Sequence, residues 1–328
     1  MNTRQWRMKH RSEVLTPDDF DIAELTLPPL GDGEVLAKVS MFALDPYLSR
    51  AMQSWNGETP GWADGTIHGR LLAEVVESKA DGLRAGDLIA GLGRWQEFEI
   101  FTARSVERVT DLEQPSFALG VLSGSGLAAW AGLHVAALEP GQTLVVSAAA
   151  GTVGSVAGQL ARARGIQVIG LAGGNAKCRH VVDVLGFDAC IDHRAGNLEQ
   201  QVKAAAPQGV DVLFENVGAP SMDAVLPAMR LRSRVILCGL AAHYNSPDPV
   251  TLQHFDALLF QQISVTPLTL RDHVAQFGRA RRELLDAIRT TTVTPQETVV
   301  DGFDIAPHAY LDMLAGAGVG KRLLRITT

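Results

Sequence analysis

Residues 143–164 read TLVVSAAAGTVGSVAGQLARAR, and they carry the strongest indication of the fold. Residues 143–149 are apolar or small and include β-branched side chains, a pattern typical of a buried strand. From Thr152 onward, apolar residues recur at helical spacing, so we expect an amphipathic helix that ends near Arg164. A buried strand followed directly by such a helix predicts an α/β unit.

A glycine-containing loop joins the expected strand to the expected helix. It runs Ala149-Ala150-Gly151-Thr152-Val153-Gly154, a form of the Gly-x-Gly-x-x-Gly pattern with alanine in the first place. Gly151 lets the backbone approach a pyrophosphate, Gly154 permits close packing of helix on strand, and the helix N-terminus offers N–H donors to the anion. The loop therefore predicts a dinucleotide site. The alternative is a plain glycine turn in an α/β protein that binds no nucleotide.

Strand–helix alternation continues after this loop. Met222, Val225, Leu226 and Met229 form a helical stripe, which Pro227 should kink. Residues 263–270 are expected to form the last strand, and Pro267 places that strand at an edge or a bend. The order predicts a doubly wound parallel sheet of the Rossmann type. The other expected strands are 167–172, 188–193, 210–217 and 234–240, and helices are expected from about 176 and over 197–206.

Residues 1–120 have a different sequence pattern, in which short strand-like segments are separated by Gly, Pro and Asp. Strands are expected at 34–41, 71–78, 88–93 and 95–101, which favours a compact, barrel-like β domain. A long amphipathic helix is expected after Asp272, followed by the strand-like pieces FDI and RLLRIT. This tail is expected to return to the first domain.

Composition and charge narrow the classes of function. The 328 residues suffice for two domains, and 46% hydrophobic with 20% charged residues is typical of a globular protein. The net charge of −7, without a Lys/Arg cluster, argues against a nucleic-acid partner. No apolar run reaches the ~20 residues that span a bilayer, and the polar N-terminus predicts no signal peptide. Three scattered cysteines, Cys178, Cys190 and Cys238, favour a reducing compartment, so the predicted location is the cytoplasm.

The residues after the second expected strand bear on the choice of cofactor. Enzymes that use NAD carry Asp or Glu there, about 20 residues after the loop, to bind the ribose hydroxyl. Here residues 171–175 read LAGGN without an acid, while Lys177 follows and Arg194 comes just after the third strand. A missing carboxylate leaves room for a 2′-phosphate and two cations would balance its charge, so NADP(H) is predicted. The alternative for Lys177 is an exposed lysine that binds nothing.

A zinc site is not expected. Alcohol dehydrogenases that use zinc hold it with Cys, His and Glu. All three cysteines here lie in the nucleotide-binding half, and Gly69 is followed by Arg70 and Leu71 instead of a His-Glu pair. We therefore expect hydroxyl groups and the cofactor to polarise a substrate carbonyl.

Motifs along nearly the whole chain match one family when taken together. They include LDPYLSRAM (44–52), VVSAAAGTVGSVAGQLA (145–161), LGFDACIDHR (185–194), GVDVLFENVG (209–218) and CGLAAHYN (238–245). The chain resembles the zinc-independent branch of the medium-chain dehydrogenase/reductase superfamily, in the group of prostaglandin reductases, plant 2-alkenal (double-bond) reductases and bacterial NADP-dependent homologues. The resemblance implies a GroES-like β-barrel-type substrate domain over 1–121, completed by 272–328, and a Rossmann NADP-binding domain over 122–271. It also implies a homodimer formed through the last Rossmann strand.

The resemblance further implies roles for individual residues. Lys177 would face the 2′-phosphate, and His193-Arg194 stand where the family commonly has Tyr-Lys. Gly318 stands where the family has an asparagine, and the segment after Pro267 departs from the usual Gly-Phe-Ile/Val. The remaining cofactor contacts implied are Gly151, Thr152, Val153, Gly154, Asn216, Cys238, Gly239, Tyr244, Leu268, Thr269 and Leu270.

Two of the three tyrosines, Tyr47 and Tyr244, fall in the motifs LDPY and CGLxxxYN. When hydride reaches the β-carbon of an enone, charge builds on the carbonyl oxygen, and a phenol O–H can stabilise it. We expect Tyr244 to be the leading donor and Tyr47 to line the opposite wall, with a packing role as the alternative for each. Tyr310 lies in an expected helix and is expected to be structural. His68 and Trp62 are further candidates for the border of the pocket.

These observations predict an NADPH-dependent, metal-free reduction of the C=C bond of α,β-unsaturated aldehydes or ketones by hydride transfer. Three alternatives stay open: an NADPH:quinone oxidoreductase on the same fold, a non-catalytic NADPH-binding protein, and a zinc alcohol dehydrogenase.

Overall fold

The computed structural model describes residues 1–53 and 64–326, and the chain divides into two compact units. The first unit comprises residues 1–120, 244–247 and 298–328, and the second comprises 121–243 and 248–297. The first stretch of the first unit ends at Gly120, next to the boundary expected at residue 121. Two segments differ from the expected domains, because 272–297 belong to the second unit and 244–247 to the first.

The second unit is built on a parallel sheet in which every neighbouring pair of strands runs in the same direction. This order confirms the predicted doubly wound sheet, with the strand before the glycine loop at its centre. β8 is buried at all four positions, as expected for a strand covered on both faces. The strands in sheet order are β10 (Ala189–Asp192), β9 (Gln167–Ala172), β8 (Thr143–Val146), β11 (Val210–Glu215), β12 (Met229–Leu237) and β13 (Ser264–Pro267).

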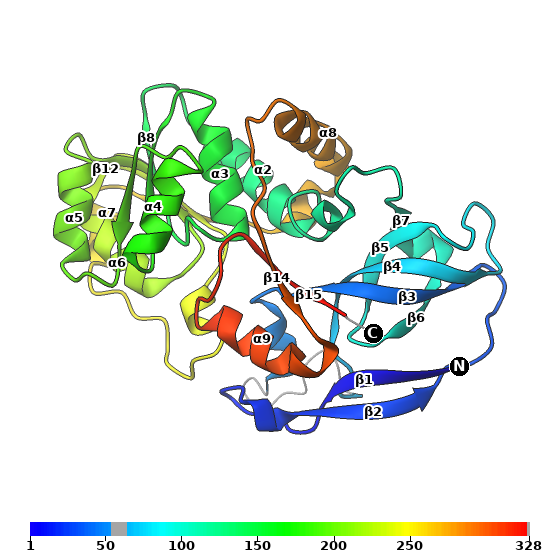
Figure 1. Ribbon diagram of the computed structural model, residues 1–328. Coiled ribbons are helices and arrows are strands. Elements are labelled where there is room, and N and C mark those ends of the chain that lie inside the picture. Colours follow the sequence, from blue (N-terminus) through cyan, green and yellow to red (C-terminus); the bar gives the residue numbers. More distant parts are fainter. Residues whose placement is uncertain (54–63, 327–328) are drawn as a thin grey trace. The chain divides into compact units, whose positions relative to one another are not determined.

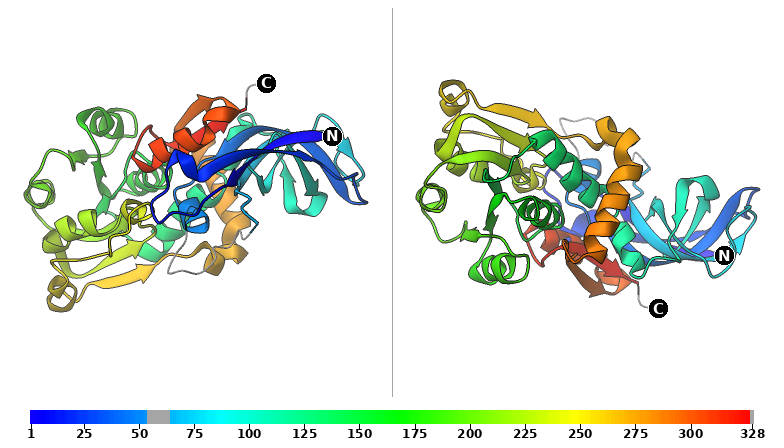
Figure 2. Two further views of the ribbon diagram at one scale, coloured as in Figure 1. Left: turned by 90° about the horizontal axis from the view of Figure 1, so that it is seen from below. Right: turned by 90° about the horizontal axis from the view of Figure 1, so that it is seen from above.

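Helices flank this sheet, and Figures 1 and 2 show them on both of its faces. The helices of this unit are α2 (Gly124–Ala136), α3 (Thr152–Arg162), α4 (Asn175–Asp183), α5 (Leu198–Ala205), α6 (Ala219–Val225), α7 (Asp256–Phe260) and α8 (Phe277–Arg289), and α8 packs on α2. Short 3₁₀ turns are η4 (Leu226–Ala228), η5 (Ala241–His243) and η6 (Leu270–Gln276).

Pro227 has a stronger effect than the expected kink. The α-helix ends at Val225, residues 226–228 form η4, and Met229 already begins β12. Proline lacks the N–H that a continuing helix needs, so the helix ends before Pro227. The helix expected from the apolar stripe was therefore one turn too long. Pro267 ends β13 at the edge of the sheet, as predicted.

The first unit contains a second sheet in which the strand pairs β15–β3, β3–β4, β3–β6, β4–β5 and β5–β7 are antiparallel. A separate antiparallel hairpin pairs β1 with β2. The strands of the sheet are β14 (Glu297–Asp301), β15 (Lys321–Arg325), β3 (Glu34–Ala43), β4 (His68–Ser78), β5 (Leu88–Arg94) and β7 (Val106–Arg108), with β6 (Phe98–Thr102) on β3. The hairpin strands are β1 (Asn2–Met8) and β2 (Phe20–Thr26).

Aromatic side chains fill the centre of the first unit. The rings of Phe42 and Trp95 stack at 5.8 Å, and Tyr310 meets Trp95 edge-on at 5.7 Å. Tyr310 lies on a helix as expected, whereas the FDI piece is a 3₁₀ turn and not a strand. The helices and turns of this unit are α1 (Leu48–Met52), α9 (Ala306–Leu314), η1 (Pro17–Asp19), η2 (Ala103–Ser105), η3 (Pro115–Leu119) and η7 (Phe303–Ile305). No helix among the described residues is long and apolar enough to cross a membrane.

Candidate cofactor and active site

The glycine loop turns sharply between β8 and α3. Ala148 has a left-handed backbone with φ of 48°, and its carbonyl accepts a hydrogen bond from the Gly151 amide at 2.8 Å. A Cβ on Gly154 would lie 2.5 Å from the Ala148 oxygen and 3.0 Å from the Ala149 Cα. Only glycine allows this approach, so the helix begins directly against the end of the strand.

The N-terminus of α3 suits an anion. No side chain caps it, and its first turn carries no acidic residue. The amides of Thr152, Val153 and Gly154 have no acceptor within the helix, because the first bond back is from Ser155 N to the Gly151 oxygen at 2.9 Å. Three N–H groups and the positive end of the helix dipole therefore meet at this loop. The predicted loop residues fit a pyrophosphate.

A second anion-compatible place follows β9. A Cβ on Gly173 would lie 2.9 Å from both the Arg194 Nε and the His193 Nε2, so these two side chains lie against the glycine. Lys177 is half-buried in the first turn of α4, and burial together with the positive charge of Arg194 lowers its pKa. Burial and Arg194 also lower the pKa of His193. Lys177 and Arg194 carry like charges that oppose each other, and such a pair favours a bound anion.

Asp192, at the end of β10, organises this second place, although the sequence analysis did not single it out. Its Oδ1 accepts hydrogen bonds from the Gly174 amide at 2.7 Å and the Arg194 amide at 2.9 Å. These bonds lower the pKa of the carboxyl, which stays ionised. The acid thus binds the backbone of the turn. An acid at the end of the third strand was the signal available in the sequence.

The end of β11 holds a buried carboxylate that the sequence analysis also missed. Glu215 is fully buried, and its Oε1 accepts hydrogen bonds from the Ser147 hydroxyl at 2.7 Å and the Gly218 amide at 2.8 Å. The Val217 amide and the Ser221 hydroxyl donate to the same oxygen at 2.6 and 2.8 Å. Burial raises the pKa of Glu215, and these donors oppose the rise. A charged residue inside an apolar strand was the signal that could have identified it.

Asn216 is fixed beside this carboxylate. Two nitrogens of Asn216 donate hydrogen bonds to Ser147. The Asn216 backbone N–H donates to the Ser147 Oγ at 2.7 Å, and the Asn216 Nδ2 donates to the Ser147 carbonyl at 2.8 Å. The Asn216 carbonyl accepts from Ala241 N at 3.0 Å, which joins the loops after β11 and β12. The predicted residue therefore lies on a rigid strand end, as a cofactor contact requires.

The other predicted residues of the second unit follow β12 and β13. The amides of Cys238 and Gly239 donate to the Glu215 carbonyl at 2.8 and 3.1 Å, and burial raises the pKa of the Cys238 thiol to about 12. The Leu268 amide donates to the Leu237 carbonyl at 2.9 Å. Thr269 donates from its hydroxyl to Asp272 at 2.6 Å, and Leu270 begins η6.

The first unit contains both candidate catalytic tyrosines. Tyr47 precedes α1 and is 54% exposed, and Asp45 lies two positions before it in the chain. Tyr244 is half-buried, and its carbonyl accepts a hydrogen bond from the Ser49 hydroxyl at 2.9 Å. The Arg50 guanidinium lies 5.8 Å from the Tyr244 ring. Gly318 also belongs to the first unit and has φ of 81°, a conformation that few side chains adopt.

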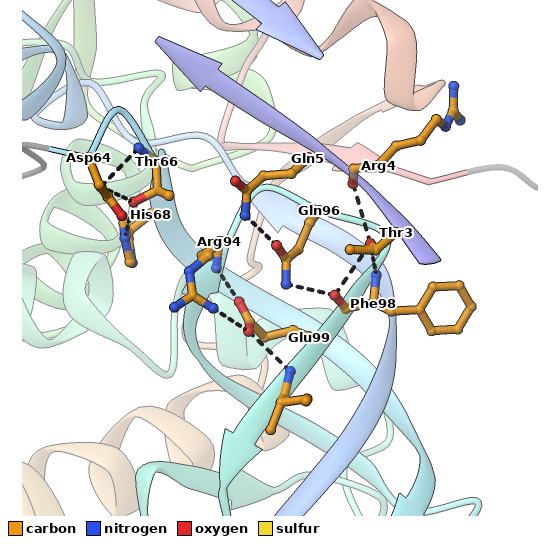
Figure 3. A network of polar contacts seen from close by, with 11 residues as sticks. Thr3, Arg4, Gln5, Asp64, Thr66, His68, Arg94, Gln96, Phe98 and Glu99 are labelled. Carbon is orange, nitrogen blue, oxygen red and sulfur yellow. Dashed lines mark hydrogen bonds and ion pairs between the residues drawn. The ribbon is translucent and has the colours of Figure 1, made fainter. Parts of the chain in front are cut away.

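A polar network on β1, β4, β5 and β6 of the first unit includes His68 (Figure 3). The His68 Nε2 lies 2.8 Å from the Thr66 hydroxyl, which donates to Asp64 at 2.7 Å. Arg94 pairs with Glu99 at 3.0 Å in the same view. Trp62, the other candidate for the pocket border, lies outside the described residues. Among the described residues, no three His, Cys, Asp or Glu side chains gather in a way that could hold a metal ion.

Comparisons with known proteins agree with this architecture. Residues 4–109 match the family model of the N-terminal domain of oxidoreductase, and residues 152–287 match that of zinc-binding dehydrogenase. The NADPH-dependent curcumin reductase of Escherichia coli (strain K12) is 33% identical, over 98% of this chain and 96% of that protein. The chain belongs to the zinc-independent branch of the medium-chain dehydrogenase/reductase superfamily.

Within this superfamily, it belongs to the group that includes the prostaglandin and 2-alkenal reductases. The NADP(+)-dependent 2-alkenal reductase of Nicotiana tabacum is 30% identical, over 94% of this chain and 93% of that protein. The crystal structure of CurA from Vibrio vulnificus in complex with NADPH superimposes with a TM-score of 0.92 at 30% identity, covering 99% of each chain. The resemblance stated from the sequence motifs is thus confirmed.

Proposed function

We propose that this reductase uses NADPH to reduce the C=C bond of a small α,β-unsaturated aldehyde or ketone, without a metal. The observation that carries the proposal is the pair of anion-compatible places in the second unit, at the glycine loop after β8 and at Gly173 after β9. Both follow the carboxyl ends of parallel strands, which is where dinucleotides bind this kind of sheet. The names of the Escherichia coli and Nicotiana tabacum relatives support the same cofactor and reaction type.

Residues of the second unit would hold the cofactor. The amides of Thr152, Val153 and Gly154 fit the pyrophosphate, and Gly151 leaves the space for it. Lys177 and Arg194 would pair with the 2′-phosphate, with His193 beside them. The nicotinamide side would be bordered by Asn216, Cys238, Gly239, Leu268, Thr269 and Leu270, and Gly318 of the first unit stands where relatives have an asparagine.

The bound nicotinamide would supply the hydride. Tyr244 then donates a hydrogen bond from its phenol to the substrate carbonyl, where negative charge develops. Tyr47 is the second donor. A phenol is protonated at neutral pH, as a hydrogen-bond donor must be. The proton for the α-carbon comes from water or from a tyrosine.

The edge strand β13 supports a homodimer. A strand at the edge of a sheet presents unpaired N–H and C=O groups on which another strand can pair. On β13, Val265 is 37% exposed, and in the segment just before it in the chain Phe255, Leu259 and Phe260 are 66%, 74% and 74% exposed. Exposed apolar side chains beside a free edge favour a protein interface. We propose a second copy of the chain as the partner, because its own β13 would extend the sheet.

A cytoplasmic location stays a prediction from the scattered cysteines.

Consumption of NADPH tests the proposal. The purified protein is mixed with NADPH and with a panel of enals, enones and quinones, and loss of NADPH absorbance is followed. We expect turnover with enals or enones and a saturated carbonyl product. Turnover with quinones alone would favour the quinone oxidoreductase, and tight NADPH binding without consumption would favour a non-catalytic binding protein.

A further inference from the structure

Ser49 links the two segments that carry the candidate catalytic tyrosines. Its side chain is completely buried, and its Oγ lies 3.0 Å from the Pro46 carbonyl and 2.9 Å from the Tyr244 carbonyl. Pro46 directly precedes Tyr47. One hydroxyl therefore contacts the main chain next to the first tyrosine and the main chain of the second, within the first unit.

The buried Tyr310 phenol is a neighbour of both Ser49 and the Pro46 carbonyl. A serine hydroxyl has a single proton and can donate fully to one acceptor. The Tyr310 phenol donates to the same Pro46 carbonyl at 3.2 Å, and its own side chain is completely buried. The Tyr310 phenol also forms a hydrogen bond with the Ser49 side chain. Because Tyr310 already donates to the Pro46 carbonyl, Ser49 can give its proton to the Tyr244 carbonyl without leaving Pro46 unpaired.

The side chains around these contacts hold both segments in place. Asn245, next to Tyr244, accepts a hydrogen bond from the Leu15 amide at 2.7 Å and from the Gln53 Nε2 at 3.0 Å. On the other segment, Asp45 forms an ion pair with the buried Lys321. Residues 244–247 consequently belong to the first unit, although the chain on either side belongs to the second.

We propose that Ser49 is a positioning residue, which fixes the Tyr244 main chain to the turn that carries Tyr47. The Tyr47 and Tyr244 phenols then keep a constant distance from each other for a substrate carbonyl, and Tyr244 remains part of the first unit. This inference rests on the proposed function, because it assumes that Tyr244 stabilises the developing oxyanion. A phenol donor stabilises the oxyanion well when supporting hydrogen bonds hold the donor in place.

A double-mutant cycle tests this role. Ser49→Ala is compared with wild type, and Ser49→Ala/Tyr244→Phe with Tyr244→Phe, by kcat on an active enone and by the Kd for NADPH. We expect Ser49→Ala alone to lower kcat about 3- to 10-fold, the effect of losing one hydrogen bond, with Kd changed less than about twofold. In the Tyr244→Phe background the same change should cost less than about twofold, because the group that Ser49 positions is gone.

Ser116→Ala is the matched control. Ser116 is also buried in the first unit and is 3% exposed, and its hydroxyl accepts a hydrogen bond from the Gln114 Nε2 at 2.9 Å. We expect its kcat to stay within about twofold of wild type. If Ser49→Ala does not fold, Tyr310→Phe takes its place in the cycle. That change removes a hydrogen-bond partner of both Ser49 and the Pro46 carbonyl, and it should lower kcat in the same, Tyr244-dependent way.

Equal losses of kcat in both backgrounds, or a loss seen only in the Kd for NADPH, would overturn the positioning role while leaving the proposed function intact. A wild-type protein that reduces no enal or enone would overturn the proposed function, and the positioning role with it.

Discussion

Gly173 lies against Arg194, and a Cβ at position 173 would come within 2.9 Å of the Arg194 Nε. In enzymes that use NAD, an acid at the end of this strand binds the ribose hydroxyl and would repel a 2′-phosphate. The glycine here leaves that space to a cation. We therefore expect the end of β9 to determine which of the two nicotinamide cofactors is preferred.

Gly173→Asp should shift the preference from NADPH toward NADH. The new carboxylate would pair with Arg194 and repel the 2′-phosphate, so kcat/KM for NADPH should fall about tenfold or more. Gly173→Ala is the control, since it displaces the Arg194 side chain without adding charge. Steady-state kinetics with both cofactors measure the ratio. An equal fall for the two cofactors in Gly173→Asp would count against this assignment.

Lys177→Ala should weaken NADPH much more than NADH. A hydrogen bond to a charged group contributes about 1.5–3 kcal/mol, so the Kd for NADPH should rise about 10- to 100-fold. Lys203→Ala is the control, because Lys203 pairs with Glu199 on the surface of α5. Equal loss of affinity for both cofactors would mean that Lys177 does not bind the phosphate.

The lowered pKa of Lys177 gives the same site a pH dependence. The bound phosphate favours the protonated lysine, so affinity for NADPH should fall as pH rises through the lysine pKa. Since that pKa is below the ordinary lysine value of 10.5, the fall should begin at lower pH than for an exposed lysine. Affinity for NADH should lack this fall. Titration of both cofactors across the alkaline range provides the measurement.

Local sequence patterns predicted most of the second unit. The strand order follows from apolar runs alternating with helical stripes, and the loop from Gly151 to Gly154 marks the central strand. The placement of residues 272–297 could not be found in this way. It depends on contacts such as the hydrogen bond of Trp130 Nε1 to Glu283 at 2.7 Å, which joins α2 to α8 across 153 positions.

Two features of the first unit left no local signal. The hairpin of β1 and β2 buries polar side chains such as Thr3 and Gln5, so it lacks the apolar alternation that indicates a strand. The membership of residues 244–247 in this unit depends on Ser49 and Asn245, whose partners are distant in sequence. The tyrosines could be identified from motifs, but the side chains that hold them could not.

Glu215→Gln should change how stability depends on pH. Burial raises the Glu215 pKa above its ordinary 4.5, so the folded chain holds a proton that the unfolded chain has lost. The free energy of unfolding should therefore fall as pH rises from about 4.5 through the raised pKa. Glutamine cannot titrate, so this component of the fall should be missing. Urea unfolding at several pH values measures it.

Glu215→Ala provides the comparison. It leaves the hydroxyls of Ser147 and Ser221 and the Gly218 amide without their acceptor, which should cost more than about 2 kcal/mol of unfolding free energy. A pH dependence in Glu215→Gln identical to that of wild type would show that another group titrates.

Leu259→Lys and Phe260→Glu should convert a dimer to monomers. Both side chains are 74% exposed on α7, which directly precedes β13 in the chain, and a charge there would be buried in the proposed interface. Light scattering after size exclusion reports the mass. Leu92→Lys is the control, because Leu92 is 67% exposed but lies in the first unit. A wild-type protein that is monomeric at micromolar concentration would exclude this interface.

Tyr244→Phe should lower turnover by about one to two powers of ten while NADPH still binds. The phenyl ring keeps the packing against Arg50, and the backbone contact with Ser49 is retained, so only the O–H group is lost. Tyr47→Phe should have the smaller effect, because Tyr47 is the second donor. Stopped-flow turnover with an active enone, and fluorescence titration of NADPH, separate chemistry from binding. Unchanged turnover on every active enone would remove Tyr244 from the mechanism and leave Tyr47 as the donor to examine.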